Sequence, residues 1–421
     1  MTAGGPAGVP LDGTVVVVGA SLAGLRAVQA LRECGFFGQV VLVGEEHHHP
    51  YDRPPLSKQV LAGKWPPERT ALADQDALGQ LGVDARLGCR AASLDAEGRR
   101  VVLDDGVVVE ADGVVLATGA HPRRLPGTED HDGVHVLRTL DDSVRLRQQV
   151  LDAGPGCRVV VVGAGFIGAE VAATCVDLGC RVTVVEALPT PLASAFGELI
   201  GGACGALHAR HGVTLRTGVV VAAVEPAGAG SETATVVELS DGTSLPADVV
   251  VVGIGVVPTT AWLEGSGLAL DDGVMCDDRL FAADGVVAAG DLARWRWRDP
   301  GGERATRIEH WEVASQMGGA AARNLLAGRA AAEPFDPVPY FWSDQYGLRI
   351  QVLGRPEPTD EVVVVDGDPQ AGDGKFVALY GRSGRLAAAL AISRPRQLMA
   401  FRPLLAAGAS WDEGLHLLED R

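Results

Sequence analysis

Short valine-rich runs alternate with longer amphipathic stretches along most of the chain. The runs at 15–18, 40–43, 159–162 and 249–252 contain no polar residue. Strands of parallel sheets read this way because helices cover both faces of the sheet. Stretches with helical spacing follow several of the runs. The pattern therefore predicts an α/β fold with two Rossmann-like units of parallel sheet and covering helices.

A repeat supports that division. The hexapeptide VVVVGA occurs at 15–20 and again at 159–164, and each copy leads into a helical stretch and a second strand. Glycines in such a turn let a pyrophosphate approach the backbone, and the N-terminus of the next helix attracts its charge. An acidic residue roughly 20 positions downstream can bind a ribose hydroxyl. Glu45 and Glu186 stand there, so the repeat predicts two dinucleotide sites.

The two copies differ in their glycines. The second has Gly163, Gly165 and Gly168, whereas the first has Gly19 and Gly24 but a serine at the middle position. A tight turn without a ligand is the alternative for each copy, and two copies in register make that alternative weaker.

Composition narrows the possible functions. Of the 421 residues 47% are hydrophobic, which suffices for two or three domain cores at roughly 100–200 residues each. The net charge of −18 argues against nucleic acid or an anionic membrane as partner, and no apolar run reaches the about 18 residues that a membrane span needs. Scattered cysteines and the lack of a secretion signal predict a cytoplasmic location.

The segment PYDRPPLSK at 50–58 resembles the NADH-dependent ferredoxin reductases, flavoproteins that supply electrons to bacterial oxygenases. The resemblance covers nearly the whole chain and includes ATG at 117–119, GIG at 253–255, GD at 290–291 and FWSDQ at 341–345.

The resemblance implies a glutathione-reductase-like fold with three domains. These are an FAD-binding domain at 1–122 and 254–329, an NAD-binding domain at 123–253, and a C-terminal α+β interface domain at 330–421. Alternating strand patterns at 349–353, 361–365 and 376–380 fit the last of them.

It also implies roles for individual residues. Lys58 and Glu170 would form an ion pair beside the flavin N5, where a lysine can stabilise reduced flavin. Asp291 would bind the ribityl chain, and Trp311 would lie near the isoalloxazine. The alternatives are a helix-surface position for Glu170 and ordinary core packing for the tryptophans. The other residues expected at FAD are Gly19, Ala23, Gly24, Glu45, Arg53, Ala91, Thr118, Arg123, Arg138 and Trp342.

For the nicotinamide, Glu186 decides the preference. A carboxylate at this position can bind a 2′-hydroxyl but repels a 2′-phosphate, and no arginine occurs in the next four residues. NADH is therefore expected rather than NADPH, unless Glu186 points to solvent. The other residues expected at NAD are Gly163, Gly165, Ile167, Gly168, Gly255 and Glu309.

The cysteines suggest no disulfide chemistry. Cys175 and Cys180 lie around the end of the helix after the second glycine turn and are interpreted as structural, and no cysteine occurs between 45 and 58. The side chains of the three consecutive histidines at 47–49 point in different directions, so these residues predict no metal site. We expect hydride transfer from NADH to the flavin and then single-electron transfers to a carrier.

That carrier is expected to be an acidic [2Fe–2S] ferredoxin. Because this chain is also acidic, docking needs a local basic patch, and Arg294, Arg296 and Arg298 are the candidates. A solvated loop with an ordinary charge run is the alternative. Two other functions stay open: a rubredoxin or monodehydroascorbate reductase, and a redox-sensing flavoprotein of the apoptosis-inducing-factor type.

Overall fold

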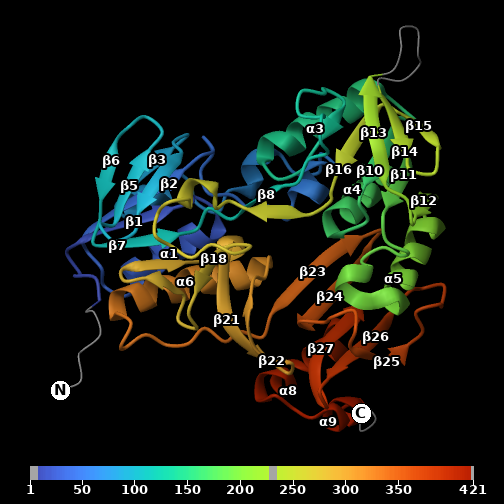
Figure 1. Ribbon diagram of the computed structural model, residues 1–421. Coiled ribbons are helices and arrows are strands. Elements are labelled where there is room, and N and C mark those ends of the chain that lie inside the picture. The colour runs from blue at the N-terminus through green and yellow to red at the C-terminus, as the bar shows by residue number, and fades with distance from the viewer. Residues whose placement is uncertain (1–7, 227–234, 419–421) are drawn as a thin grey trace. The chain divides into compact units, whose positions relative to one another are not determined.

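The computed structural model describes residues 8–226 and 235–418 (Figure 1). The chain forms two compact units. One comprises Met1–Asp52, Ala71–His121 and Val257–Pro339, and the other Arg53–Thr70, Pro122–Val256 and Tyr340–Arg421. No helix among the described residues combines the length and the apolar character needed to cross a bilayer.

The first unit is built on a six-stranded sheet in the order β19-β20-β7-β1-β2-β3. β1 (Thr14–Val18) lies between β2 (Gln39–Gly44) and β7 (Gly113–Leu116) and pairs in parallel with both. Its valines are almost wholly buried as a result. β3 (Val83–Leu87), β20 (Val286–Ala288) and β19 (Phe281–Ala283) complete the sheet. This is the buried parallel sheet that the valine runs predict.

Two helices of this unit pack closely together, α1 (Leu22–Glu33) and α6 (Trp311–Ala327), as Figure 1 shows. A Cβ on Gly318 would lie 2.2 Å from the carbonyl oxygen of Ala23, so the backbones touch there. The other elements are α2 (Gln75–Gln80), β4 (Ala91–Asp95), β5 (Arg100–Leu103), β6 (Val108–Glu110), η3 (Ala261–Leu263), β18 (Val274–Cys276), η4 (Gly290–Leu292), β21 (Ala293–Asp299) and β22 (Gly302–Thr306).

The second unit contains a parallel sheet of the same kind, in the order β12-β11-β10-β16-β9. β10 (Arg158–Val162) pairs with β11 (Arg181–Glu186) and β16 (Val249–Val252). The other elements of this part are η1 (Leu56–Val60), η2 (Pro67–Thr70), β9 (Val134–His135), α3 (Leu140–Ala153), α4 (Phe166–Asp177), α5 (Ala193–Arg210), β12 (Thr214–Thr217), β13 (Val221–Pro226), β14 (Thr235–Leu239) and β15 (Ser244–Ala247). β8 (Ala120–Pro122) and β17 (Val256–Pro258) lie where the chain passes from one unit to the other.

The same unit includes an antiparallel sheet in the order β23-β24-β27-β26-β25. Its strands include the three expected from the alternating patterns. The aromatic rings of Phe166 at the start of α4 and Phe341 in β23 are 4.8 Å apart, so α4 packs against this sheet. The elements are β23 (Tyr340–Gln345), β24 (Leu348–Gly354), β25 (Glu361–Gly367), β26 (Phe376–Arg382), β27 (Arg385–Ile392), α7 (Pro395–Met399), α8 (Arg402–Ala407) and α9 (Trp411–His416).

Candidate dinucleotide and redox site

The turn between β1 and α1 can be made only by glycine at two positions. Gly19 has φ +119°, a conformation that favours glycine. A Cβ there would lie 2.1 Å from the oxygen of Ala117, and a Cβ on Gly24 would lie 1.9 Å from the oxygen of Gly19. Ser21 stands at the N-cap of α1 and makes no side-chain capping bond. The first N–H groups of the helix are thus not bonded by that hydroxyl, which fits a phosphate at this end.

The turn between β10 and α4 repeats this geometry in the second unit. Gly163 has φ +97°, and a Cβ on Gly168 would lie 2.1 Å from the oxygen of Gly163. Gly165 differs, because the nearest atom to its Cβ position is the oxygen of Gly253, 3.9 Å away. Packing leaves room for a side chain at Gly165, so its absence keeps the helix N-terminus open to a ligand. Ile167, one residue into α4, is 45% exposed.

The acidic residues that follow the two turns differ in their contacts. Glu186 ends β11, and its carboxylate accepts hydrogen bonds from the backbone N–H groups of Ala164 (2.7 Å) and Leu188 (2.9 Å). The carboxylate therefore points at the glycine turn and not away into solvent. Glu45 follows β2, is exposed, and pairs with Arg90.

The first unit also contains several of the other expected FAD residues. Trp311 begins α6, is half-buried against the core, and donates from Nε1 to Asp52 Oδ1 at 2.6 Å. Sequence reasoning did not single out Asp52, although it lies within the proline-rich segment. Thr118 donates to the oxygen of Thr259 at 3.1 Å, and Asp291 lies in η4.

Two more predicted residues of this unit, Glu309 and Ala91, have defined surroundings. Glu309 pairs with Arg307, which also donates to the oxygen of Asp291 at 3.2 Å. Ala91 is buried at the start of β4.

In the second unit, Lys58 and Glu170 form the expected ion pair. Lys58 Nζ lies 2.6 Å from Glu170 Oε2, and the Glu170 side chain is only 4% exposed. The helix-surface alternative for Glu170 is therefore wrong. Ser57 and Ser343 also donate to this carboxylate, at 2.5 and 2.8 Å. Sequence reasoning missed both serines.

Two other predicted residues of this unit, Arg53 and Arg123, donate to backbone oxygens. Arg53 donates to the oxygen of Arg138 at 2.6 Å, and the N–H of Arg123 donates to the oxygen of Gly255 at 2.9 Å. Trp342 is half-buried, and its ring lies 6.0 Å from that of Tyr340.

The arginine-rich segment is a strand, β21, so the alternative of a solvated loop is wrong. Trp295 and Trp297 alternate with the arginines and are buried, and their indole N–H groups donate to the backbone oxygen of Phe335 and to Asp336. Arg294 pairs with Asp271 at 2.7 Å, and Arg298 with Glu303 at 3.1 Å. These carboxylates offset most of the charge of the candidate patch, and Arg296 is exposed.

All seven cysteines are free. Cys175 is buried in α4, and Cys180 is half-buried just before β11. A hydrogen bond to Cys180, together with burial, raises the pKa of the Cys157 thiol, which disfavours the reactive thiolate. His49 Nε2 lies 3.1 Å from Gln75 Oε1. Among the described residues, the one group spaced for a metal ion is Cys89, Asp104 and Asp105, none of which is buried.

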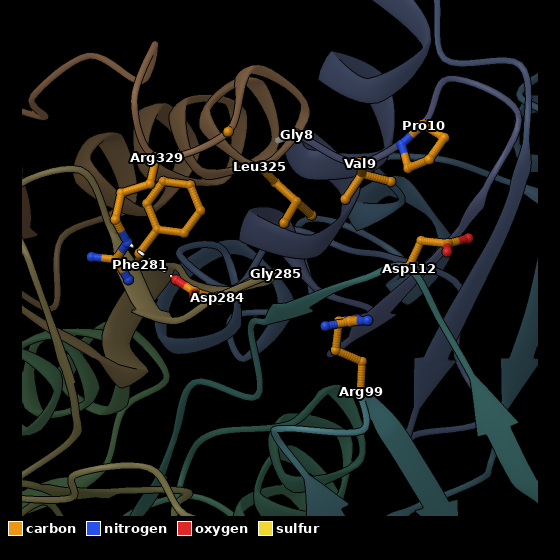
Figure 2. A pocket seen from close by; sticks show the side chains of 11 residues that line it. Gly8, Val9, Pro10, Arg99, Asp112, Phe281, Asp284, Gly285, Leu325 and Arg329 are labelled. Carbon is orange, nitrogen blue, oxygen red and sulfur yellow. Dashed lines mark ion pairs between the residues drawn. The ribbon is translucent and has the colours of Figure 1, made fainter. Parts of the chain in front are cut away.

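A cavity of about 200 Å³ lies in the first unit. Figure 2 shows part of its wall, with the apolar side chains of Val9, Leu325 and Phe281 and the ion pair between Arg329 and Asp284. Arg329 Nε lies 3.5 Å from Asp284 Oδ1. Asp112 directly precedes β7, so the cavity adjoins the amino ends of the strands. Dinucleotides bind at the carboxyl ends, and this cavity is therefore not part of the dinucleotide site.

Two pyrophosphate-type turns and a buried lysine–glutamate pair define an oxidoreductase that combines a flavin with a nicotinamide. The model of the pyridine nucleotide-disulphide oxidoreductase family matches residues 13–318, and the reductase C-terminal model matches residues 340–417. The chain belongs to the pyridine nucleotide-disulphide oxidoreductase family, whose members use FAD and NAD(H).

Individual relatives are similar over nearly the full length. The ferredoxin–NAD(+) reductase component of the anthranilate 1,2-dioxygenase system of Burkholderia cepacia is 37% identical over 94% of this chain and 95% of its own. Putidaredoxin reductase CamA of Pseudomonas putida is 34% identical over 90% and 89%. The reductase in the covalent putidaredoxin reductase–putidaredoxin complex superposes with a TM-score of 0.88, at 30% identity over 97% and 99% of the two chains. The predicted fold class and the resemblance to ferredoxin reductases are confirmed.

Proposed function

We propose that this chain is an NADH-dependent ferredoxin reductase of the cytoplasm, which passes electrons through FAD to a [2Fe–2S] ferredoxin that serves an oxygenase. The observation that carries the proposal is the pair of glycine turns with matching geometry in one chain. Relatives named as ferredoxin–NAD(+) reductases, similar over nearly their whole length, support the choice of acceptor.

We assign the FAD domain to 1–122 and 254–329, the NAD domain to 123–253 and the interface domain to 330–421. The turn at Gly19 and Gly24 would hold the FAD pyrophosphate, because only hydrogen atoms fit on the inner side of that turn. The turn at Gly163 and Gly168 would hold the pyrophosphate of NADH in the same way.

When bound, FAD can accept two electrons at once from a nicotinamide and pass them on one at a time. The chain's own contribution is orientation and charge. Glu186 would accept hydrogen bonds from the ribose hydroxyls, and its negative charge would repel a 2′-phosphate. Lys58, fixed by Glu170, presents a positive charge to the flavin. Arg296, exposed on β21, offers a contact for an acidic carrier. The neighbouring carboxylates weaken its attraction for such a carrier at long range.

The test is anaerobic stopped-flow reduction of the purified protein by NADH, followed by cytochrome c reduction with added [2Fe–2S] ferredoxins. Yellow protein, rapid reduction by NADH and ferredoxin-dependent cytochrome c reduction are expected. Protein that stays colourless after incubation with FAD would refute the flavin assignment. Slow reoxidation, a long-lived charge-transfer band and NADH-dependent dimerisation would instead indicate a redox sensor.

A further inference from the structure

The carboxylate of Glu170 is held by donors from two separate segments of the second unit, η1 and β23. Oε2 accepts from Lys58 Nζ at 2.6 Å and from Ser57 Oγ at 2.5 Å. Oε1 accepts from Ser343 Oγ at 2.8 Å and from the backbone N–H of Asp344 at 3.3 Å. The residue is 3% exposed, so water cannot readily replace a missing donor.

A carboxylate offers about four lone-pair sites, and four donors surround this one. Lys58 and Ser57 bind one oxygen, while β23 supplies both donors to the other. With only the first oxygen bound, the carboxylate could rotate about its bond to the side chain. Bonds to both oxygens fix its plane and therefore the position of the Lys58 ammonium group.

The hydroxyl of Ser343 is itself oriented. Gln345 Nε2 donates to Ser343 Oγ at 3.1 Å, so that oxygen acts as an acceptor for Gln345, and its single proton is available for Glu170. Ser343 and Gln345 are 0% and 1% exposed. Both lie on β23, which pairs along its length with β24. A paired strand is a rigid mounting for a donor.

We propose that Ser343 is a positioning residue for Lys58, so that the C-terminal sheet, besides any role in contacting a partner, sets the geometry of the lysine that faces the flavin. The inference rests on the proposed function, in which Lys58 lies beside the flavin. Loss of the Ser343 hydroxyl leaves one oxygen of Glu170 with the weaker 3.3 Å backbone bond alone and frees Lys58 to move.

Amine labelling tests the positional claim without relying on turnover. The chain has three lysines, Lys58, Lys64 and Lys375, so mass spectrometry can follow each one separately. Lys58 is 12% exposed in its ion pair, whereas Lys64 is 67% exposed and serves as an internal reference. In the protein as purified, Ser343→Ala is expected to raise the labelling rate of Lys58 relative to Lys64 by at least about threefold.

The matched control is Tyr380→Phe. It also removes a buried hydroxyl from the C-terminal sheet, one that donates to the oxygen of Phe196 at 3.2 Å, but it does not reach Glu170. Its Lys58 labelling should equal that of the wild type. If Ser343→Ala does not fold, Ser343→Cys retains most of the volume and only a weak donor, and should also raise Lys58 labelling.

In the flavin-loaded enzyme, Ser343→Ala should slow flavin reduction at saturating NADH several-fold and leave the Kd for NADH unchanged. Unchanged Lys58 labelling together with an unchanged reduction rate would overturn the proposal. Because labelling does not require turnover, a change in Lys58 labelling in a protein that fails to reduce ferredoxin would support the Ser343 linkage and refute only the proposed acceptor.

Discussion

Replacement of Glu186 by alanine is the sharpest test of nicotinamide preference. The carboxylate is held toward the glycine turn by the N–H groups of Ala164 and Leu188. It is therefore preorganised to accept hydrogen bonds from the adenosine ribose. The substitution Glu186→Ala removes that acceptor and also removes the negative charge that would face a 2′-phosphate.

The two effects have different sizes. A hydrogen bond to a charged group contributes about 1.5–3 kcal/mol, so kcat/KM for NADH should fall roughly 10- to 100-fold. Two unit charges 4 Å apart near a protein surface repel by about 4 kcal/mol at an effective dielectric constant of 20. Glu186 is half-buried, and solvent screening reduces that figure to about 1–2 kcal/mol. NADPH should therefore gain roughly tenfold, and the preference for NADH should fall at least about 100-fold.

The assay is the bleaching of flavin absorbance by each nucleotide in a stopped-flow instrument, over a range of concentrations. Glu238→Ala is the matched control, because it removes one negative charge from β14 of the same unit, where the carboxylate accepts only from Ser244 in the described structure. The control should keep the wild-type preference. If Glu186→Ala keeps it too, the argument that this carboxylate selects NADH is wrong.

Four further outcomes are expected. Lys58→Met leaves the buried Glu170 without a cation, which should cost about 3–5 kcal/mol in chemical denaturation and slow flavin reduction; unchanged values for both would exclude the ion pair from either role. Gly168→Ala places a Cβ 2.1 Å from a backbone oxygen, so reduction by NADH should be lost while flavin content is retained. Burial lowers the pKa of His208 to about 4, so on acidification the unfolded chain takes up this proton near the ordinary histidine pKa of about 6.5 and the folded chain only near 4. The contribution of His208 to the free energy of unfolding should therefore be constant above about pH 6.5 and fall by up to about 3 kcal/mol toward pH 4. The variant His208→Phe should lack this loss. Arg296→Glu should raise KM for an acidic ferredoxin and weaken its salt dependence, whereas an unaffected KM would remove β21 from the docking surface.

The fold could be predicted from the sequence because its information is local. Each VVVVGA run is a buried strand followed by a glycine turn, and the clash distances at Gly24 and Gly168 explain why no other residue type stands there. The carboxylate of Glu186 also follows from local geometry, because the end of β11 places it next to the turn at Gly163.

The strand at 294–298 was missed although the signal was present. Arginine and tryptophan alternate in this segment, and strict alternation of polar and apolar residues indicates a half-buried strand. The charge of the arginines suggested a basic patch or a solvated loop instead. The structure buries the tryptophans and leaves Arg296 and Arg298 exposed, as the period of two requires.

The surroundings of Glu170 mark the limit of sequence reasoning. In α4, Glu170 is the only charged residue before Asp177, and alanine, valine and glycine surround it. A helix that is apolar on all sides is expected to be buried, and a buried carboxylate needs partners, so its burial could have been predicted. Its donors could not, because Ser57 and Ser343 are 113 and 173 residues away in sequence. Only the tertiary fold brings these hydroxyls to one carboxylate. A double substitution of both serines should therefore raise the labelling rate of Lys58 by more than the two single substitutions do together.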